Sequence, residues 1–166
     1  MMKSRNPSFT SPRHQAKINF YSPSCWVSKT ICRVADTAYT HCTVEAGDTG
    51  LLFHVDEDSS RWRSCRSLHK LMDPLVQLRL FTPRPLNVGH ATPILSVLRF
   101  DATALSAWAI NRRKGHVTDQ PDSCVEAVRR WLAIGGLEIE QGTPDEIYYH
   151  LIQDYGAVPL HPRRTR

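Results

Sequence analysis

The amino-acid sequence predicts an α+β domain, in which a small antiparallel sheet packs against helices. Two neighbouring segments rich in β-branched and aromatic residues are joined by a short turn that contains glycine. Two later segments carry apolar residues at helical spacing between clear helix caps. The 166 residues are 41% hydrophobic and 22% charged, which suits a single buried core. We therefore expect one domain rather than two.

The predicted elements begin with residues 17–22, KINFYS, where apolar side chains alternate enough for a short strand. Pro23 and Ser24 then open a helix over residues 25–34, because the apolar residues there recur at helical spacing. One face of this helix should be buried.

A β-hairpin is predicted next, from residues 39–45, YTHCTVE, and residues 50–55, GLLFHV. Gly47 and Asp48 suit the centre of a tight turn, since glycine supplies the positive φ that a type II′ turn needs. The sequence therefore predicts two adjacent antiparallel strands here.

The position of the turn decides which residues face each other across the hairpin. With a Gly47–Asp48 centre, His41 lies directly opposite His54, at a Cβ separation of about 4.5–5.5 Å. A centre at Asp48–Thr49 instead places His41 opposite Asp56. A third reading leaves the two histidines unrelated.

Residues 56–93 give no clear pattern, and three prolines within residues 82–93 favour a loop there. Residues 101–111, DATALSAWAIN, again show helical spacing after an acidic start. Residues 112–122 are polar and should form a loop.

The last two helices have the strongest signals. Residues 122–133 combine an N-cap, an apolar face and a stop at Gly135. The final helix, residues 144–154, follows a capping box formed by Thr143 and Glu146.

The charge is distributed unevenly. There are 21 basic and 16 acidic residues, a formal net charge of +5. Seven of the basic residues lie in residues 1–17 and 163–166, which contain no acid, and so the rest of the chain has 14 basic against 16 acidic residues. We expect basic tails over residues 1–16 and 161–166 that make at most weak contact with an anionic surface, and the balance argues against a nucleic-acid-binding core.

Compartment and cysteine usage point to the cytoplasm. Every apolar run is far shorter than the roughly 20 residues that span a bilayer, and residues 1–15 lack the apolar segment of a secretory signal. An odd number of cysteines without framework spacing predicts reduced thiols rather than disulfides. These cysteines are Cys25, Cys32, Cys42, Cys65 and Cys124.

Cys124 is the candidate nucleophile. It falls in the first turn of a capped helix, where free backbone N–H groups and the positive end of the helix dipole favour a thiolate. Activation also requires a nearby base. The alternative is a buried cysteine that only fills the core.

Two stretches of the chain resemble the permuted branch of the papain-like fold. SPSCWVSKTICRVADTAYTHCTVEAG is similar to a helix that leads into the histidine strand, with Thr40-His41 in place of the usual Ser-His, and SCVEAVRRWL is similar to the cysteine helix. This branch contains the permuted NlpC/P60 amidases of the YiiX and YaeF type and the lecithin retinol acyltransferase type. Its order is strand, helix, histidine strand, a strand with a second polar residue, and much later a cysteine that opens a helix.

The resemblance implies a permuted papain-like domain over residues 17–160, with a possible insertion at about 57–115. It implies Cys124 as nucleophile, His41 as general base and His54 as the group that orients His41. The implied activity is that of a cysteine hydrolase or acyltransferase, which cleaves an amide or ester through an acyl-enzyme. No cofactor is implied, and the substrate would be a peptide, peptidoglycan or an acyl lipid.

Two further readings stay open within the enzyme class and outside it. A groove lined by Phe53, Trp62 and Leu68 would favour lipid esters, whereas a polar cleft would favour peptides. Outside the enzyme class, the same fold serves as a silent structural or interaction module, for example in a virus particle.

A metal site is the remaining competitor. Cys65 and His69 stand four residues apart, and further cysteines and histidines are present. The paired spacings of real zinc sites, such as C-x-x-C, do not occur in the sequence, and so we expect no metal.

Overall fold

The structure, a computed structural model, describes residues 14–23, 26–69 and 74–160. The elements in chain order are β1 (His14–Tyr21), α1 (Trp26–Ala35), β2 (His41–Glu45), a 3-10 turn (Gly47–Thr49), β3 (Leu51–His54), β4 (Arg61–Ser64), α2 (Cys65–His69), β5 (Val76–Thr82), α3 (Val88–Leu95), α4 (Ala102–Arg113), α5 (Cys124–Ile134), α6 (Pro144–Tyr155) and β6 (Val158–Leu160).

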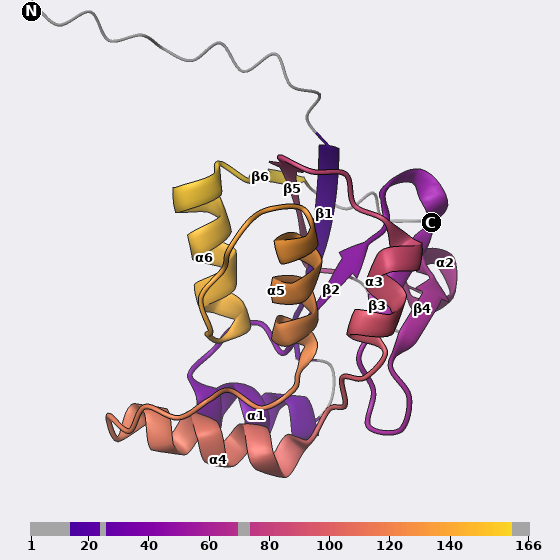
Figure 1. Cartoon of the computed structure of the whole chain (residues 1–166). Helices are drawn as coiled ribbons and strands as arrows, with labels where there is room; N and C mark the ends of the chain where they lie inside the picture. Colours follow the sequence, from indigo (N-terminus) through magenta and orange to yellow (C-terminus); the bar gives the residue numbers. More distant parts are fainter. Residues whose placement is uncertain (1–13, 24–25, 70–73, 161–166) are drawn as a thin grey trace, which may run out of the picture.

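The strands form one sheet in the order β4-β3-β2-β1-β5-β6, and every neighbouring pair is antiparallel. Helices α5, α6 and α3 lie over one face of this sheet, and α1 and α4 run side by side across its lower end (Figure 1). The predicted α+β class is therefore confirmed.

The sheet buries an apolar face against α5. Alternate residues of the central strands, such as Ile18, Phe20 and Val44, are fully buried, together with Trp131 and Leu132 of the helix. We call this side of the sheet the apolar face. The intervening residues, such as Asn19 and Thr43, lie on the other side, which we call the polar face.

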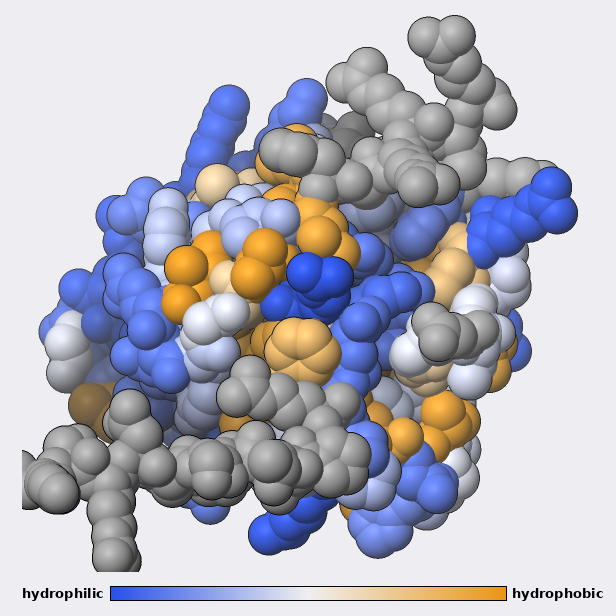
Figure 2. Space-filling view, turned by 90° about the horizontal axis from the view of Figure 1, so that it is seen from above, coloured by the Kyte–Doolittle hydropathy of each residue, from blue (hydrophilic) through white to orange (hydrophobic). Residues whose placement is uncertain are grey.

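The outer surface is mainly hydrophilic. Seen from above, it carries a small group of apolar residues among polar ones (Figure 2). Strands β5 and β6, at this end of the molecule, hold the exposed side chains of Phe81 and Val158. Within the part of the chain that the structure describes, no helix is both long and apolar enough to cross a membrane.

The first strand is longer than predicted. It begins at His14 rather than Lys17, and Ala16, expected to lie in a basic tail, is fully buried. The reason is tertiary pairing, because β5 extends along β1 as far as the pair of His14 with Thr82. The rest of the two predicted tails lies outside the described residues.

The hairpin has a different turn from the one predicted at Gly47–Asp48. A 3-10 turn is followed by Gly50 with φ of 69°, and the strands pair Val44 with Phe53. The Thr49 hydroxyl donates to the Ala46 carbonyl (2.7 Å) and accepts from the Leu51 N–H (3.2 Å), which stabilises this longer connection.

Residues 57–115 contribute to the same sheet and core. This segment supplies β4, α2, β5, α3 and α4, and β5 pairs directly with the central strand β1. The three helices predicted after residue 100 are observed as α4, α5 and α6, and the capping box of Thr143 and Glu146 is present.

Candidate active site

Cys124 is the first residue of α5. Ser123 precedes it in extended conformation and caps the helix, with its hydroxyl accepting a hydrogen bond from the Glu126 N–H (3.4 Å). The N–H groups of this first helical turn lack intrahelical acceptors, and the helix dipole is positive here. The Cys124 side chain therefore sits where a thiolate is stabilised, although the residue is only 5% exposed.

The pKa of the Cys124 thiol lies well below its usual range. The largest cause is the hydrogen-bonding interaction with the Cys42 thiol. Burial opposes it by raising the pKa, and the charge and hydrogen-bonding interaction of His41 lower the pKa further. In the neighbouring Cys42, burial raises the pKa well above the usual range. Because Cys124 also lies at a helix N-terminus, we expect it to be the more acidic of the two thiols.

His41 stands at the start of β2. Strand alternation assigns it to the polar face, while its neighbour Cys42 lies on the apolar face. As the first residue of the strand it lies at the end of the sheet, where its imidazole interacts with Cys124. The imidazole also contacts the rings of Tyr21, at 5.6 Å between centroids, and His54, at 5.1 Å.

His54 is held in its neutral form. Burial, then the positive charges of His41 and Arg63, lower its pKa to about 4. Its Nδ1 lies 4.0 Å from a carboxylate oxygen of Asp56, which in turn accepts from Arg63 at 3.2 Å. A neutral His54 can accept or donate a hydrogen bond and orient a second imidazole.

The two histidines meet diagonally rather than directly opposite each other. The pairing of Val44 with Phe53 places His54 across from Thr43, and the continued register places His41 across from Asp56. The predicted direct opposition of His41 and His54 is therefore wrong, and the alternative register is the one observed. Because the observed register differs from the predicted one by two residues, both side chains stay on the same face of the sheet and their rings still touch.

Two ring nitrogens at this contact make no hydrogen bond to the described residues. Among the described residues, neither Nε2 of His41 nor Nδ1 of His54 has a hydrogen-bond partner, and both atoms are buried. Leaving a buried polar atom without a partner costs free energy.

The loop that leads into β2 is fastened by α6. The Asp145 carboxylate accepts hydrogen bonds from the Thr37 hydroxyl (2.5 Å), the Ala38 N–H (2.8 Å) and the Tyr39 N–H (2.9 Å). Asp145 thereby fixes the chain just before His41. This role of Asp145 could not be predicted from the sequence, because residues 37 and 145 meet only in the tertiary structure.

Two residues of the site itself were also missed. The only sequence signal for Asp56 was the alternative hairpin register, which places it opposite His41. Cys42 appeared only among the cysteines expected to be reduced, and nothing in the sequence signals that its thiol lies beside Cys124 of a distant helix.

The predicted apolar groove and the predicted free thiols have different outcomes. Phe53, Trp62 and Leu68 do not form a groove: Phe53 and Leu68 are buried, and Trp62 stacks edge-on against Phe53 and Trp131. Four of the predicted free thiols are observed as such, at Cys32, Cys42, Cys65 and Cys124, while Cys25 lies outside the described residues.

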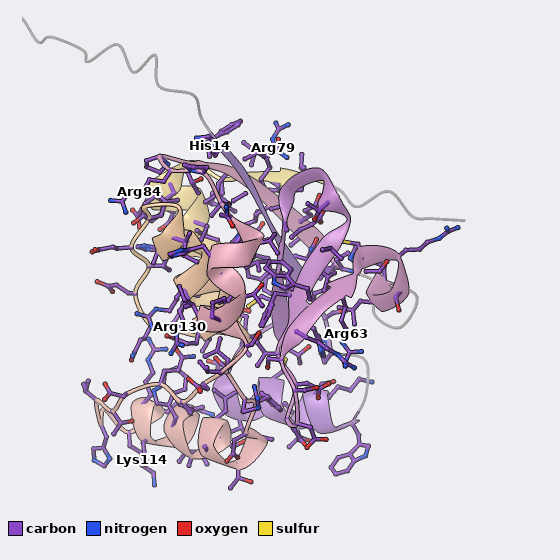
Figure 3. All side chains as sticks on the ribbon, turned by 45° about the vertical axis from the view of Figure 1, so that its right-hand side comes forward. His14, Arg63, Arg79, Arg84, Lys114 and Arg130 are labelled. Atoms are coloured by element: carbon purple, nitrogen blue, oxygen red, sulfur yellow. The ribbon has the colours of Figure 1, made fainter. Side chains whose placement is uncertain are left out.

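A metal site and a basic stripe each place requirements on the described residues. Within the described ranges, no group of three or more histidine, cysteine or acidic residues is arranged to hold a metal ion. Six basic residues lie on different sides of the domain (Figure 3) rather than along one stripe; they are His14, Arg63, Arg79, Arg84, Lys114 and Arg130.

Comparison of the chain with protein-family models, with curated proteins and with solved structures finds no match. The functional argument therefore depends on the geometry of Cys124, His41 and His54.

Proposed function

We propose that the chain is a cysteine hydrolase or acyltransferase of permuted papain-like type, which cleaves an amide or ester through an acyl-enzyme on Cys124. The observations that carry the proposal are the position of Cys124 at a helix N-terminus, the influence of His41 on its thiol, which lowers the pKa, and the ring contact of His41 with His54. The order β1, α1, the His41 strand, the His54 strand and the Cys124 helix supports the papain-like assignment.

In this mechanism His41 accepts the proton of the Cys124 thiol, and the thiolate attacks the substrate carbonyl carbon. Backbone N–H groups of the first turn of α5 stabilise the oxyanion, at about 2.7–4 kcal/mol for each donor. His41 then protonates the leaving amine or alcohol, and water or another acceptor releases the acyl group. Neutral His54 orients His41, as the third member of a catalytic triad does.

One observation favours the non-catalytic alternative. Cys124 is only 5% exposed and belongs to the apolar cluster of the core, an environment that also suits an inert filler. A non-catalytic interaction module would keep the packing of Cys124 against Cys42 but would not need His41 to activate the Cys124 thiol.

The pH dependence of alkylation decides between the two functions. Iodoacetamide labelling of each cysteine, followed by mass spectrometry from about pH 5 to 10, should give Cys124 an apparent pKa below the reference of about 8.5. The His41→Ala variant should shift that value upward, because a stabilising charge and hydrogen bond are lost.

The chain supplies its own controls for this measurement. Burial raises the pKa of the Cys32 and Cys65 thiols to about 11, and so both should label only at high pH. His116 is exposed on a loop, and His116→Ala should leave the Cys124 profile unchanged. A Cys124 profile that resembles that of Cys65 and ignores His41 would favour the silent module.

A further inference from the structure

A small cavity adjoins the candidate nucleophile. Its volume is about 30 Å³, and it lies between α1, α4 and the N-terminus of α5. Its walls include Val34 of α1, Leu105, Trp108 and Ala109 of α4, and Cys124 itself. Cys124, only 5% exposed, therefore borders free space at this cavity.

Apart from Cys124, the lining of the cavity carries no formal charge. Besides Cys124 and Tyr39 it consists of aliphatic, aromatic, hydroxyl, proline and amide side chains, without a lysine, arginine, histidine, aspartate or glutamate. A charged group placed there would lose its hydration without gaining a counter-charge, which is strongly unfavourable. The cavity therefore suits an uncharged, mainly apolar group.

The size of the cavity limits the group that fits. One water needs about 10–15 Å³ by this measure, and so the space accepts roughly two or three non-hydrogen atoms. Trp108 forms a firm wall, since it is buried, its indole N–H donates to the Thr118 carbonyl (3.2 Å), and the Arg112 guanidinium lies 5.2 Å from its ring centroid.

We infer that the cavity binds the acyl part of the substrate, and that this part is a short, uncharged alkyl chain such as that of a butyryl group. This inference rests on the proposed function, because it places the acyl-enzyme carbonyl at Cys124. Helix α4 then sets the chain length that the enzyme accepts. An acyl group with a free carboxylate and a long fatty acyl chain would both be poor substrates.

The covalent step balances with water as the second substrate. The Cys124 sulfur forms a bond to the acyl carbon, the bond from that carbon to the leaving oxygen or nitrogen breaks, and the thiol proton passes through His41 to the leaving group. Water then adds to the acyl carbon, the carbon–sulfur bond breaks, and the free acid and the thiol are released.

A series of 4-nitrophenyl esters tests the inference directly. The esters are acetate, butyrate, hexanoate, dodecanoate and the monoester of succinate, and the readouts are kcat/KM and the mass of the acylated protein. Butyrate should be the best substrate. Dodecanoate, which is too long, and succinate, which matches butyrate in length but is charged, should each be at least about tenfold worse.

Variants of α4 locate the effect in the cavity. Leu105→Ala should move the optimum from butyrate to hexanoate, and Ala109→Val, which fills the cavity, should move it to acetate. Ile110 is exposed on the same helix, is absent from the lining, and serves as control: Ile110→Ala should keep the optimum at butyrate.

The outcomes separate this inference from the proposed function. Acylation of Cys124 at similar rates by all esters, or a chain-length profile that both α4 variants leave unchanged, would refute the acyl site and leave the cysteine hydrolase standing. If none of the esters acylates Cys124, and Cys124→Ala hydrolyses them as fast as the wild type does, both proposals fail.

Discussion

The two faces of the sheet are built on different principles. On the apolar face, hydrocarbon and aromatic side chains pack against α5. On the polar face the Asn19 amide donates to Thr43 (3.4 Å), whose hydroxyl also bonds the Tyr21 hydroxyl (3.1 Å). The Gln77 amide donates to Asn19 (2.8 Å) and to Glu45 (2.9 Å). The apolar face is stabilised by burial of hydrocarbon surface, and the polar face by hydrogen bonds between its side chains.

This difference explains where the candidate site lies. Cys124 belongs to the helix on the apolar face, which supplies burial and a helix N-terminus, whereas His41 and His54 belong to the polar face. The site forms at the end of β2, where the two environments meet. This boundary brings a helix N-terminal thiol and a strand histidine together.

The apolar face should respond most strongly to loss of volume. Trp131 is fully buried and packs edge-on against Trp62, with 5.4 Å between ring centroids. Trp131→Ala should lower the free energy of unfolding by about 3–5 kcal/mol, measured by urea denaturation.

Trp131→Phe sharpens that test. Within the described residues the indole N–H of Trp131 has no hydrogen-bond partner, and so phenylalanine loses part of the packing and no hydrogen bond. Its cost should be clearly smaller than that of alanine. Equal costs for both variants would mean that the indole N–H is bonded and that this face is less purely apolar than described.

The polar face should instead respond to pH, through His54. Its pKa is about 4 in the folded protein against an ordinary 6.5, so the unfolded chain binds the proton more readily. Above about pH 6.5 His54 is neutral in both states, and the free energy of unfolding has its full value. As the pH falls towards 4, the free energy of unfolding decreases by up to about 3 kcal/mol, because the unfolded chain takes up the proton first. His54→Asn should remove this part of the pH dependence, measured as urea stability at pH 7 and pH 4.5.

Comparing the wild type with His54→Asn separates the effect of His54 from that of the other titrating groups. The groups that face it are His41, Arg63, Asp56 and Cys124, and all remain in the variant. His116→Asn, on an exposed loop, should follow the wild type. If wild type and His54→Asn lose the same stability between pH 7 and pH 4.5, His54 is not buried in neutral form.

The helices that carry their own local signals could be predicted from the sequence. The Thr143 and Glu146 capping box and the Ser123 N-cap determine where α6 and α5 begin, independently of the rest of the fold. Cys124 could be placed at a helix N-terminus for the same reason. His41 and His54 could be assigned to one face because their separation keeps the same parity in either register.

Elements that depend on distant partners were harder to predict. Strand β5, VQLRLFT, does alternate, but Pro74 and the mixed pattern of residues 68–80 obscured its start. Helix α3 contains Pro93 and depends on the Asn87 side chain, which caps it by accepting from the His90 N–H (3.0 Å). The contact of Cys42 with Cys124 depends on how α5 packs against β2, which no local pattern reveals.

The smallest expected effect is also the sharpest comparison of the two faces. Thr43 and Val44 are neighbours on β2 with nearly isosteric side chains that point to opposite sides of the sheet. Thr43→Val removes the acceptor of Asn19 and the partner of Tyr21, both buried, and should cost about 1–2 kcal/mol in urea denaturation. Val44→Thr should cost a similar amount for the converse reason, since it buries a hydroxyl among hydrocarbon. Thr43→Ser keeps the hydroxyl and should cost less than Thr43→Val; if the two are equal, the hydrogen bonds of Thr43 contribute nothing and the polar face is stabilised by packing alone.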